Sequence, residues 1–378
     1  MLLIKNAKVY APEYVGKKDL LVCGGKIECM EDKIEDFPIA CEVIDAEERI
    51  LTPGFIDQHV HVTGGGGEGS FHTRTPELQL SELVKGGITT VVGLLGTDGL
   101  TRSVENLCAK VQALCEEGVS AYMLTGYPSP TITGEVDRDI MFVEKVLGVK
   151  LAISDHRAPN VTESELIQLA SKTRTAGMLS GKPGIVVLHM GDADAGLSPV
   201  FEALEKSMIP IKIFRPTHVN RRKGLLEEGY QLLEKGGYID LTCGISEDFC
   251  PGGCILEAKE KGIPTEHITI SSDGHGSWSK YREDGSLLEI GVSSVDALRE
   301  ELLYMVHELD MKLEDALPYM TSHVAEALGL QGKKGTIQKG ADADLLLWDN
   351  DLKLVSYIAG GKIFMQKEKI ICKGTYEK

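Results

Sequence analysis

The sequence contains side chains of metal-ligand type at the ends of short apolar runs that lie far apart along the chain. They span more than 200 positions and are His59, His61, Lys150, His189, His218 and Asp273. Imidazole nitrogens and carboxylate oxygens are common ligands of zinc in catalytic sites. Side chains two positions apart on a strand point to the same side, so His59 and His61 would face one point. These residues predict a metal site, provided that the fold gathers the ends of the runs.

Lys150 differs from the other five because it lies inside an apolar run, residues 147–153. Full burial lowers the pKa of an ammonium group by up to about 3–5 units. One interpretation is that the stem of Lys150 is buried while its charged end reaches solvent at the rim. The other is that the neutral amine captures carbon dioxide. The product would be a carbamate, a carboxylate on a long arm that is able to bridge two cations.

The elements that must position these residues form a regular series. Eight short apolar runs begin at residue 51, and they are residues 51–56, 89–95, 120–124, 149–153, 184–188, 211–214, 238–241 and 268–270. Helix-like segments lie between them, at residues 76–85, 104–117, 163–175 and 225–235. A strand followed by a helix, eight times over, is typical of a (β/α)8 TIM barrel, whose strand ends meet at one rim. The alternative, a doubly wound open sheet, would not need eight repeats and would place chemistry at one switch point.

The two ends of the chain show a different pattern, in which apolar and polar residues alternate. Gly24-Gly25 and Gly360-Gly361 mark hairpin turns within them. Alternation with a period of two predicts β-strands. Neither end is long enough to bury a core alone. We therefore expect residues 1–50 and 336–378 to form one composite β-sandwich beside an α/β barrel of residues 51–335.

Charge and composition exclude several classes of function. The formal net charge of −17 argues against a nucleic-acid partner, because phosphate binding needs a basic surface. No run approaches the roughly 18 apolar residues of a membrane span, and residues 1–5 do not begin a signal peptide. The nine cysteines are then expected to be reduced thiols of a cytoplasmic protein. Cys243, Cys250 and Cys254 form a cluster whose loose spacing makes a structural zinc site a weak alternative to loop cysteines.

The order of the ligand-type residues resembles the binuclear metal-dependent amidohydrolase superfamily. The chain has His-x-His after the first run, a lysine in the fourth, two later histidines and an aspartate after the eighth. Residues 341–345, Ala-Asp-Ala-Asp-Leu, are similar to the strand that returns such chains to their β-sandwich. Longer motifs resemble one family within it, the isoaspartyl dipeptidases. They are residues 53–69, which include Gly64-Gly65-Gly66-Gly67-Glu68, and residues 91–98, 153–157, 189–192, 216–221 and 271–274.

The resemblance implies two zinc ions per subunit and a CO2-derived carbamate on Lys150. One ion would have His59, His61 and Asp273 as ligands, and the other would have His189 and His218, with carboxylated Lys150 between them. Zinc lowers the pKa of bound water to about 7, so a hydroxide bridging the ions would attack an amide carbonyl. Asp273 would take the proton and deliver it to the leaving amine.

The resemblance also implies a substrate, an isoaspartyl dipeptide. Such a molecule carries an ammonium group, an α-carboxylate beside it and a second carboxylate on the leaving amino acid. Arg157 and Arg221 carry planar guanidinium groups that suit the carboxylates. Glu68 would bind the ammonium group. The products would be aspartate and an amino acid.

Further residues near the predicted strand ends are expected to contact the substrate, on weaker sequence evidence. The phenol of Tyr127 would donate to the developing oxyanion. Thr97, Ser277 and the backbone N–H of Gly66 are possible polar contacts. The resemblance predicts Asn at position 275, where this sequence has His275, which is expected to face a loop. Family members assemble into rings, so a homo-oligomer is implied.

Two alternatives stay open on the sequence alone. One is an amidohydrolase that opens a cyclic amide, as dihydroorotases and hydantoinases do. Such substrates lack a free ammonium group, so Glu68 would have no partner there. The other is a non-catalytic amidohydrolase-like scaffold that acts by protein association. Scaffolds of that kind lose metal ligands, whereas this chain has every one of them.

Overall fold

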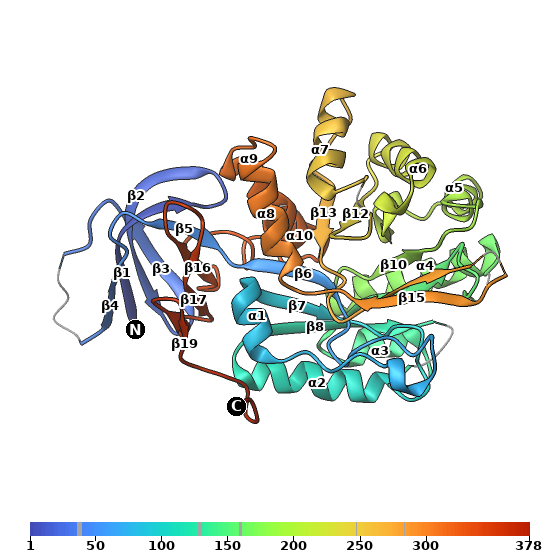
Figure 1. The fold of residues 1–378 in the computed structure, drawn as a ribbon, viewed down its shortest axis with the longest axis horizontal. Coiled ribbons are helices and arrows are strands. Elements are labelled where there is room, and N and C mark those ends of the chain that lie inside the picture. Colours follow the sequence, from blue (N-terminus) through green and yellow to red (C-terminus); the bar gives the residue numbers. More distant parts are fainter. Residues whose placement is uncertain (36–39, 128–130, 159–160, 247, 283) are drawn as a thin grey trace.

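The computed structural model describes residues 1–35, 40–127, 131–158, 161–246, 248–282 and 284–378. A β-sheet built from both chain ends lies at one side of the molecule, and a larger α/β part lies beside it (Figure 1). Among the described residues, no helix is both long and apolar enough to cross a membrane.

The larger part is a (β/α)8 barrel, as the sequence predicted. Its wall consists of β6 (Phe55–Val60), β7 (Ile88–Gly93), β8 (Ser120–Gly126), β9 (Val146–Ile153), β10 (Ile185–Met190), β11 (Phe214–Thr217), β12 (Ile239–Thr242) and β13 (Ile268–Ser271). Strands β6 to β11 form one six-stranded parallel sheet, and β12 and β13 form a separate parallel pair. In the described chain, no backbone ladder joins β11 to β12, and only an isolated bridge between Val60 and Gly274 joins the region after β13 to β6.

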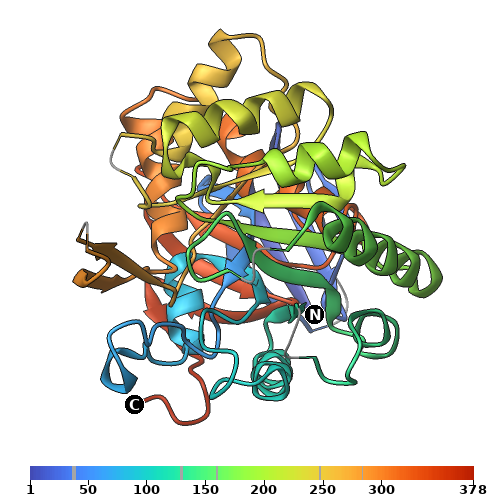
Figure 2. The same cartoon turned by 90° about the vertical axis from the view of Figure 1, so that its right-hand side faces the viewer.

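Helices alternate with these strands, as Figures 1 and 2 show. The α-helices are α1 (Leu80–Gly86), α2 (Val104–Glu117), α3 (Val136–Phe142), α4 (Glu163–Ser180), α5 (Ser198–Glu205), α6 (Lys223–Glu234), α7 (Pro251–Glu260), α8 (Ala297–His307), α9 (Leu313–Ala316) and α10 (Ser322–Ala327). The 3-10 turns are η1 (Phe71–Thr73), η2 (Ile211–Ile213), η3 (Val219–Arg221) and η4 (Leu317–Met320). Their ends follow local chemistry: Ser103 caps the start of α2, and Gly118 ends it in the left-handed conformation.

Two of the eight predicted strands were placed wrongly. The run 51–56 is divided by Gly54 into β5 (Ile50–Pro53), which belongs to the chain-end sheet, and β6. A Cβ atom on Gly54 would lie 2.1 Å from Thr89 Oγ1, so the close approach requires glycine. The run 211–214 forms the turn η2, and β11 begins at Phe214, where pairing with Val186 of β10 begins.

Over the described residues, the chain-end sheet has nine strands and joins the two ends as expected. They are β1 (Leu2–Tyr10), β2 (Tyr14–Cys23), β3 (Lys26–Glu31), β4 (Glu42–Asp45), β5, β16 (Leu345–Trp348), β17 (Leu354–Ala359), β18 (Lys362–Gln366) and β19 (Lys369–Ile370). Strand β5 pairs with β1 on one side and with β16 on the other. Side chains from both ends, including Leu20, Leu51 and Leu345, share one buried core. The domain boundaries at 50/51 and 335/336 stay predictions.

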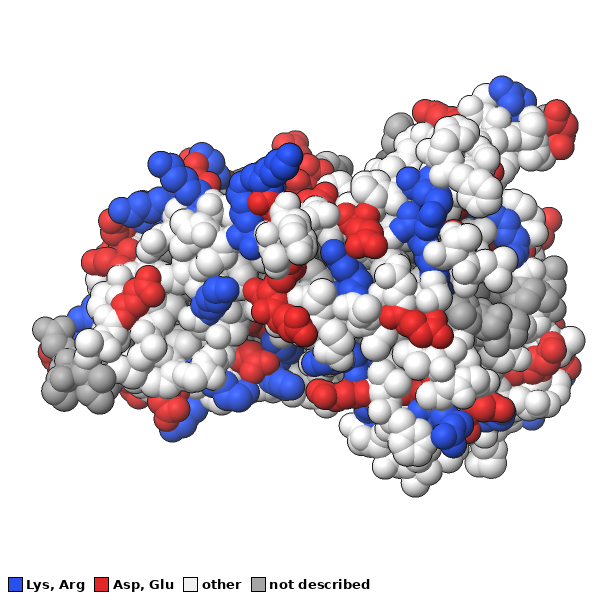
Figure 3. All heavy atoms as spheres, turned by 90° about the horizontal axis from the view of Figure 1, so that it is seen from below, with Lys and Arg blue, Asp and Glu red and all other residues white. Residues whose placement is uncertain are grey.

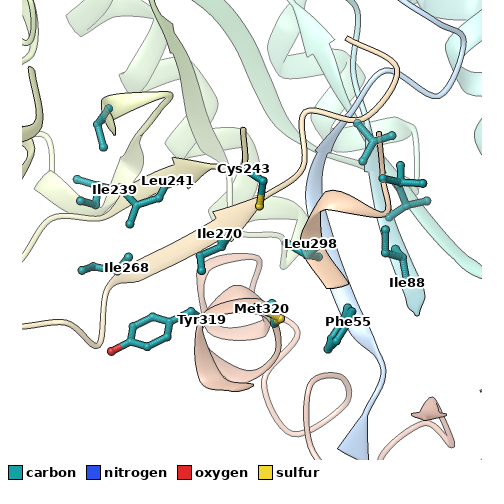
Figure 4. Packing of buried hydrophobic residues seen from close by; sticks show 14 of the residues in the cluster. Phe55, Ile88, Ile239, Leu241, Cys243, Ile268, Ile270, Leu298, Tyr319 and Met320 are labelled. Atoms are coloured by element: carbon teal, nitrogen blue, oxygen red, sulfur yellow. The ribbon is translucent and has the colours of Figure 1, made fainter. Parts of the chain in front are cut away.

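Alternating side chains on β12 and β13 separate an apolar outer face from a polar inner one. Ile239 and Leu241 of β12, with Ile268 and Ile270 of β13, are buried in the main core, and Tyr319 and Met320 lie beside them (Figure 4). The intervening residues are polar and equally buried, and they are Asp240, Thr242, Thr269 and Ser271. Because strand neighbours point to opposite faces, these four side chains point into the barrel.

A hairpin of β14 (Ser277–Tyr281) and β15 (Leu287–Val292) follows β13 and projects from the barrel (Figures 1 and 2). The apolar runs of the sequence did not predict this hairpin. On the face shown in Figure 3, Lys and Arg side chains lie interspersed with Asp and Glu side chains.

Candidate active site

The predicted histidine pair lies at the end of the first barrel strand. His59 belongs to β6, and His61 follows its last residue, Val60. Both are buried. Nε2 of His61 lies 3.1 Å from Oδ1 of Asp273, and Nε2 of His59 lies 3.6 Å from the same oxygen. Two imidazoles and a carboxylate separated by more than 210 positions therefore meet at one point, as the spacing predicted.

The two later histidines join the same group. His189 lies in β10, and His218 directly follows β11 in the left-handed conformation, with φ of 63°. The ring of His218 lies 4.6 Å from that of His189 and 4.9 Å from that of His59, measured between centroids. Nδ1 of His218 lies 2.8 Å from the hydroxyl of Thr242. Its Nε2 atom is thereby left for the centre of the group.

This group fits a metal ion. One ligand atom each from His59, His218 and Asp273 lie within 4.8 Å of one another. Both ring nitrogens of His59, Nδ1 of His61 and Nε2 of His218 are buried without a hydrogen-bond partner among the described residues. Burial holds the pKa of His59 and His218 well below the usual value, so their imidazoles are neutral. Buried, neutral and unpaired imidazole nitrogens beside a carboxylate are a suitable donor set for zinc.

Lys150 lies in β9 and lines the same cavity as the cluster. Burial lowers its pKa to about 8, although Asp273 acts in the opposite direction. Roughly a tenth of the amine is then neutral at pH 7, far more than for an exposed lysine. Its Nζ atom donates to the carbonyl oxygen of Leu95 at 3.0 Å. Burial thus raises the neutral fraction of the amine, the form that reacts with CO2, while the ammonium form still predominates at pH 7.

The seven predicted substrate contacts line one cavity of about 940 Å³ at this end of the barrel. They are Gly66, Glu68, Thr97, Tyr127, Arg157, Arg221 and Ser277. The predicted ligands His61, Lys150, His189 and Asp273 line it as well. The structure therefore brings the predicted residues together, while the role of each stays a prediction.

Glu68 lies among polar partners in this cavity. The hydroxyl of Ser277 donates to its carboxylate, at 2.9 Å from Oε1 and 3.0 Å from Oε2. Thr97 Oγ1 and Arg157 Nη1 each lie 3.4 Å from Oε1. The Glu68 side chain is only 5% exposed. A buried carboxylate with an opposite charge beside it is suited to binding a molecule that carries both charges.

The two arginines have different surroundings. The guanidinium group of Arg157 donates to both oxygens of Asp155, from Nε at 3.0 Å and from Nη2 at 2.9 Å. Only its Nη1 atom faces Glu68. Nε of Arg221 lies 3.6 Å from Asp192 Oδ1 and has no hydrogen-bond partner within the described parts of the chain. Arg221 is thus the freer of the two for a carboxylate.

Asp155 is a site residue to which the sequence analysis gave no role. Besides Arg157, its Oδ2 atom lies 3.2 Å from Nε2 of His189. Burial acts to raise the pKa of Asp155, but hydrogen bonds from His189 and Arg157 hold it far below the usual value. One carboxylate thus connects a predicted metal ligand with a predicted substrate contact. Its place two residues before Arg157 was the available signal.

Backbone geometry supports the predicted loop contacts. Gly66 has φ of 78°, and a Cβ atom there would lie 2.5 Å from the carbonyl oxygen of Thr73. Only glycine therefore fits this bend. His275 is buried against the same region, with Nδ1 2.9 Å from the carbonyl oxygen of Pro76 and Nε2 3.2 Å from Glu82. Its carbonyl oxygen accepts from the backbone N–H of Gly65, so it braces the glycine loop.

Comparison with known proteins gives three kinds of match. A family model described as "Amidohydrolase family" matches residues 253–375. The chain is similar to a crystal structure of β-aspartyl dipeptidase from Fervidobacterium islandicum AW-1 in complex with β-Asp-Leu dipeptide. The two are 41% identical, with a TM-score of 0.94 over 98% of this chain and 97% of that chain.

More distant matches have other activities. Dihydroorotase of Elusimicrobium minutum is 26% identical over 92% of this chain and 88% of that protein. Dihydropyrimidinase of Brevibacillus agri is 17% identical, with a TM-score of 0.71 over 98% of this chain and 96% of that chain. The second match concerns the fold alone.

Proposed function

Because the chain belongs to the amidohydrolase family and is a hydrolase, we propose that it cleaves β-aspartyl dipeptides, releasing aspartate and an amino acid. The observation that carries this proposal is the opposed pair of charges on Glu68 and Arg157, in the cavity that also holds the metal-ligand cluster. The similar Fervidobacterium enzyme was crystallised with β-Asp-Leu, which agrees with it.

We assign the predicted metal ligands to two zinc ions. One ion would have His59, His61 and Asp273 as ligands, and the other would have His189 and His218, with carboxylated Lys150 between them. Zinc bound by these residues would supply a water of lowered pKa, about 7, and a Lewis acid for the amide carbonyl. The unpaired nitrogens of His59 and His218, and the pKa of about 8 for Lys150, support this assignment.

The substrate's charged groups have matching partners in the cavity. In a β-aspartyl dipeptide, the free ammonium and α-carboxylate groups sit on one carbon. Glu68 Oε1 and Arg157 Nη1 lie 3.4 Å apart, so the ammonium can bind Glu68 while the α-carboxylate binds Arg157. Asp155 holds the Arg157 side chain in place. Arg221, whose Nε has no partner among the described residues, would bind the carboxylate of the leaving amino acid.

Two side chains would move or stabilise charge during hydrolysis. Burial acts to raise the pKa of Asp273, but its bond with His61 lowers it to about 2, so the carboxylate is ionised at neutral pH. It can accept the proton of the attacking water and pass it to the leaving amine. Tyr127, which lines the cavity, would donate its phenol hydrogen to the oxyanion that develops on the carbonyl.

The main competing function is the opening of a cyclic amide. The similarity to a dihydroorotase at 26% identity is the observation that favours it. Dihydroorotate and hydantoins carry no ammonium group, so Glu68 would have no charge to bind. The variant Glu68→Gln keeps the size of the side chain and removes its charge. We expect kcat/KM for β-Asp-Leu to fall by about 100-fold or more, because a buried ammonium would lose its partner. Full activity of this variant would favour the cyclic-amide function.

The decisive experiment compares β-Asp-Leu with α-Asp-Leu, dihydroorotate and hydantoin, using protein purified with zinc. In α-Asp-Leu the ammonium lies next to the scissile carbonyl, so the paired charges no longer fit Glu68 and Arg157. We expect kcat/KM to be at least about 100-fold higher for β-Asp-Leu than for α-Asp-Leu. Equal rates on the two peptides, or turnover of a cyclic amide alone, would contradict the proposal. Protein that takes up no zinc and stays inactive would support a scaffold.

A further inference from the structure

Asp240 is a buried carboxylate that the proposed chemistry does not use. It is the second residue of β12 and points into the barrel, where it is only 4% exposed. Its Oδ2 atom accepts from the hydroxyls of Thr217 at 2.7 Å and Ser271 at 2.6 Å. Its Oδ1 atom accepts from Gln58 Nε2 at 2.7 Å and from Thr269 Oγ1 at 2.8 Å. These donors come from three other elements of the wall, β6, β11 and β13.

The same three strands carry metal-ligand residues. Gln58 directly precedes His59, Thr217 directly precedes His218, and Ser271 lies two residues before Asp273. These histidines and Asp273 are also the three residues whose ligand atoms lie within 4.8 Å of one another. Asp240 is therefore hydrogen-bonded to a residue on each of the strands that lead to these three, while it forms no hydrogen bond with any of the three among the described residues.

The position of Asp240 also compensates for a gap in the barrel wall. We call the two junctions β11–β12 and β13–β6 the seams, because no backbone ladder closes either one in the described residues. The bond to Thr217 crosses the first seam, and the bond to Gln58 connects β12 with β6 beyond the second. Asp57 adds to the second seam by accepting from the hydroxyl of Ser272. Side chains thus add to the hold on the strands where the described residues form no backbone ladder.

A role confined to ion pairing does not account for this arrangement. The partly buried Arg215 lines the same small internal cavity, but its guanidinium donates to the carbonyl oxygens of Phe214 and Ala327 and stacks on Tyr238 at 3.8 Å. Burying a carboxylate without a cation is costly unless its oxygens are well supplied with donors. The donors around Asp240 meet that need, and they tie the strands together in doing so.

We propose that Asp240 is a positioning residue for the metal centre, which fixes β6, β11 and β13 so that His59, His218 and Asp273 converge before metal binds. This inference rests on the metal-binding part of the proposed function and is independent of the substrate. Partners of this kind, which orient ligands without touching the metal, typically change metal affinity by about 10–100-fold when removed.

The test is the affinity for Zn²⁺, measured by competition with a coloured chelator, together with the melting temperature of the metal-free protein. We expect Asp240→Ala to raise the zinc dissociation constant by about 10–100-fold. Asp240→Asn keeps one accepting oxygen and should recover part of this affinity. A matched control is Asp139→Ala, because Asp139 is a buried carboxylate with donors from Thr125, Ile132 and Thr133 and no contact to a predicted ligand.

The control variant should lower the melting temperature while leaving the zinc dissociation constant within about twofold of the wild type, since no donor to Asp139 adjoins a predicted ligand. The inference is overturned if Asp240→Ala lowers the melting temperature and leaves zinc affinity unchanged. If that variant does not fold, Asp240→Asn and Thr217→Val decide by the same measurement. Wild-type protein that binds no zinc would overturn both proposals. Wild-type protein that binds zinc but leaves β-Asp-Leu intact would contradict only the proposed substrate.

Discussion

The two parts of the barrel wall are held closed by different interactions. From β6 to β11, backbone ladders join neighbouring strands, and the inner face carries apolar side chains such as Val92, Leu124 and Ile185. Around β12 and β13, side-chain hydrogen bonds cross the seams, and the inner face carries Asp240 and Thr269. The metal-ligand group His59, His218 and Asp273 comes from the strands that border the seams.

This difference means that strand positions are fixed by the backbone in one part of the barrel and by side chains in the other. A ladder fixes strand register through the backbone, whatever the side chains are. A seam depends on individual side chains, so a single substitution there can shift a ligand. The laddered part carries Lys150 and His189, and the loops after β7 and β9 carry Thr97 and Arg157. The predictions below test whether the two parts respond differently to substitution.

The largest effect is expected for Lys150→Ala, which removes a proposed metal ligand from the laddered part without touching a ladder. Hydrolysis of β-Asp-Leu should fall by about 10³-fold or more, since two cations would lose their shared carboxylate. The stability of the metal-free protein should change little, because a buried amine is itself costly. Short carboxylic acids such as acetate should restore part of the activity by occupying the place of the carbamate. Activity within tenfold of the wild type would contradict the proposal that a carbamate on Lys150 bridges the two zinc ions.

A smaller effect, with a defined pH dependence, is expected at the seam. Burial raises the pKa of Asp240 from 3.8 to about 6, so the folded state binds more protons than the unfolded state between these values. The stability that this group contributes is therefore fully present below pH 3.8 and is lost as the pH rises through 6. Asp240→Asn does not titrate. The advantage of the metal-free wild type over this variant should fall by roughly 2 kcal/mol between pH 4 and pH 7.5.

Chemical unfolding of both proteins at a series of pH values measures this difference. The buried histidines titrate in both proteins, so their contribution cancels in the comparison. An advantage of the wild type that grows toward neutral pH would show that folding lowers the pKa of Asp240, which would contradict this prediction.

The smallest expected effect is on the free energy of unfolding. It compares the laddered part of the wall with the seam directly, because the same Thr→Val substitution is made in each. Thr217→Val removes a hydroxyl that crosses the β11–β12 seam and should lower the free energy of unfolding by about 1–2 kcal/mol. Thr90→Val in β7 removes a buried hydroxyl that has no partner among the described residues. It should leave stability unchanged or raise it by about 1 kcal/mol. Denaturant unfolding measures both variants. An equal loss of unfolding free energy in the two would show that the seam does not depend on side-chain hydrogen bonds more than the laddered part does.

The sequence predicted the barrel because its signal is repeated and local. Each apolar run is followed by a helix-like segment, and α2 occupies the predicted residues 104–117. The break at Gly54 was missed because it depends on the approach of Thr89 from another strand. The hairpin β14–β15 was missed although Asp284-Gly285 is a turn signal, because its strands carry mixed polar and apolar side chains.

Within the site, convergence was predictable and partners were not. Parallel strands in a barrel bring their ends to one rim, so the gathering of His59, His218 and Asp273 followed from the fold. The partners of Arg157 depend on how one loop folds, so the position of Asp155 two residues earlier was a signal that did not predict two bonds to its carboxylate. Asp240 was visible as a single polar residue in an apolar run, but its four donors come from three other strands, whose placement around it depends on the closed barrel.

The pairing of β5 with β16 has a consequence for how the protein is made. Leu51 pairs with Leu347, so almost 300 residues must leave the ribosome before β5 gains its second neighbour. Until then the nascent chain exposes an open strand edge, only one residue away from the first strand of the barrel. A chain truncated before residue 345 would keep that edge permanently, and such edges recruit other chains.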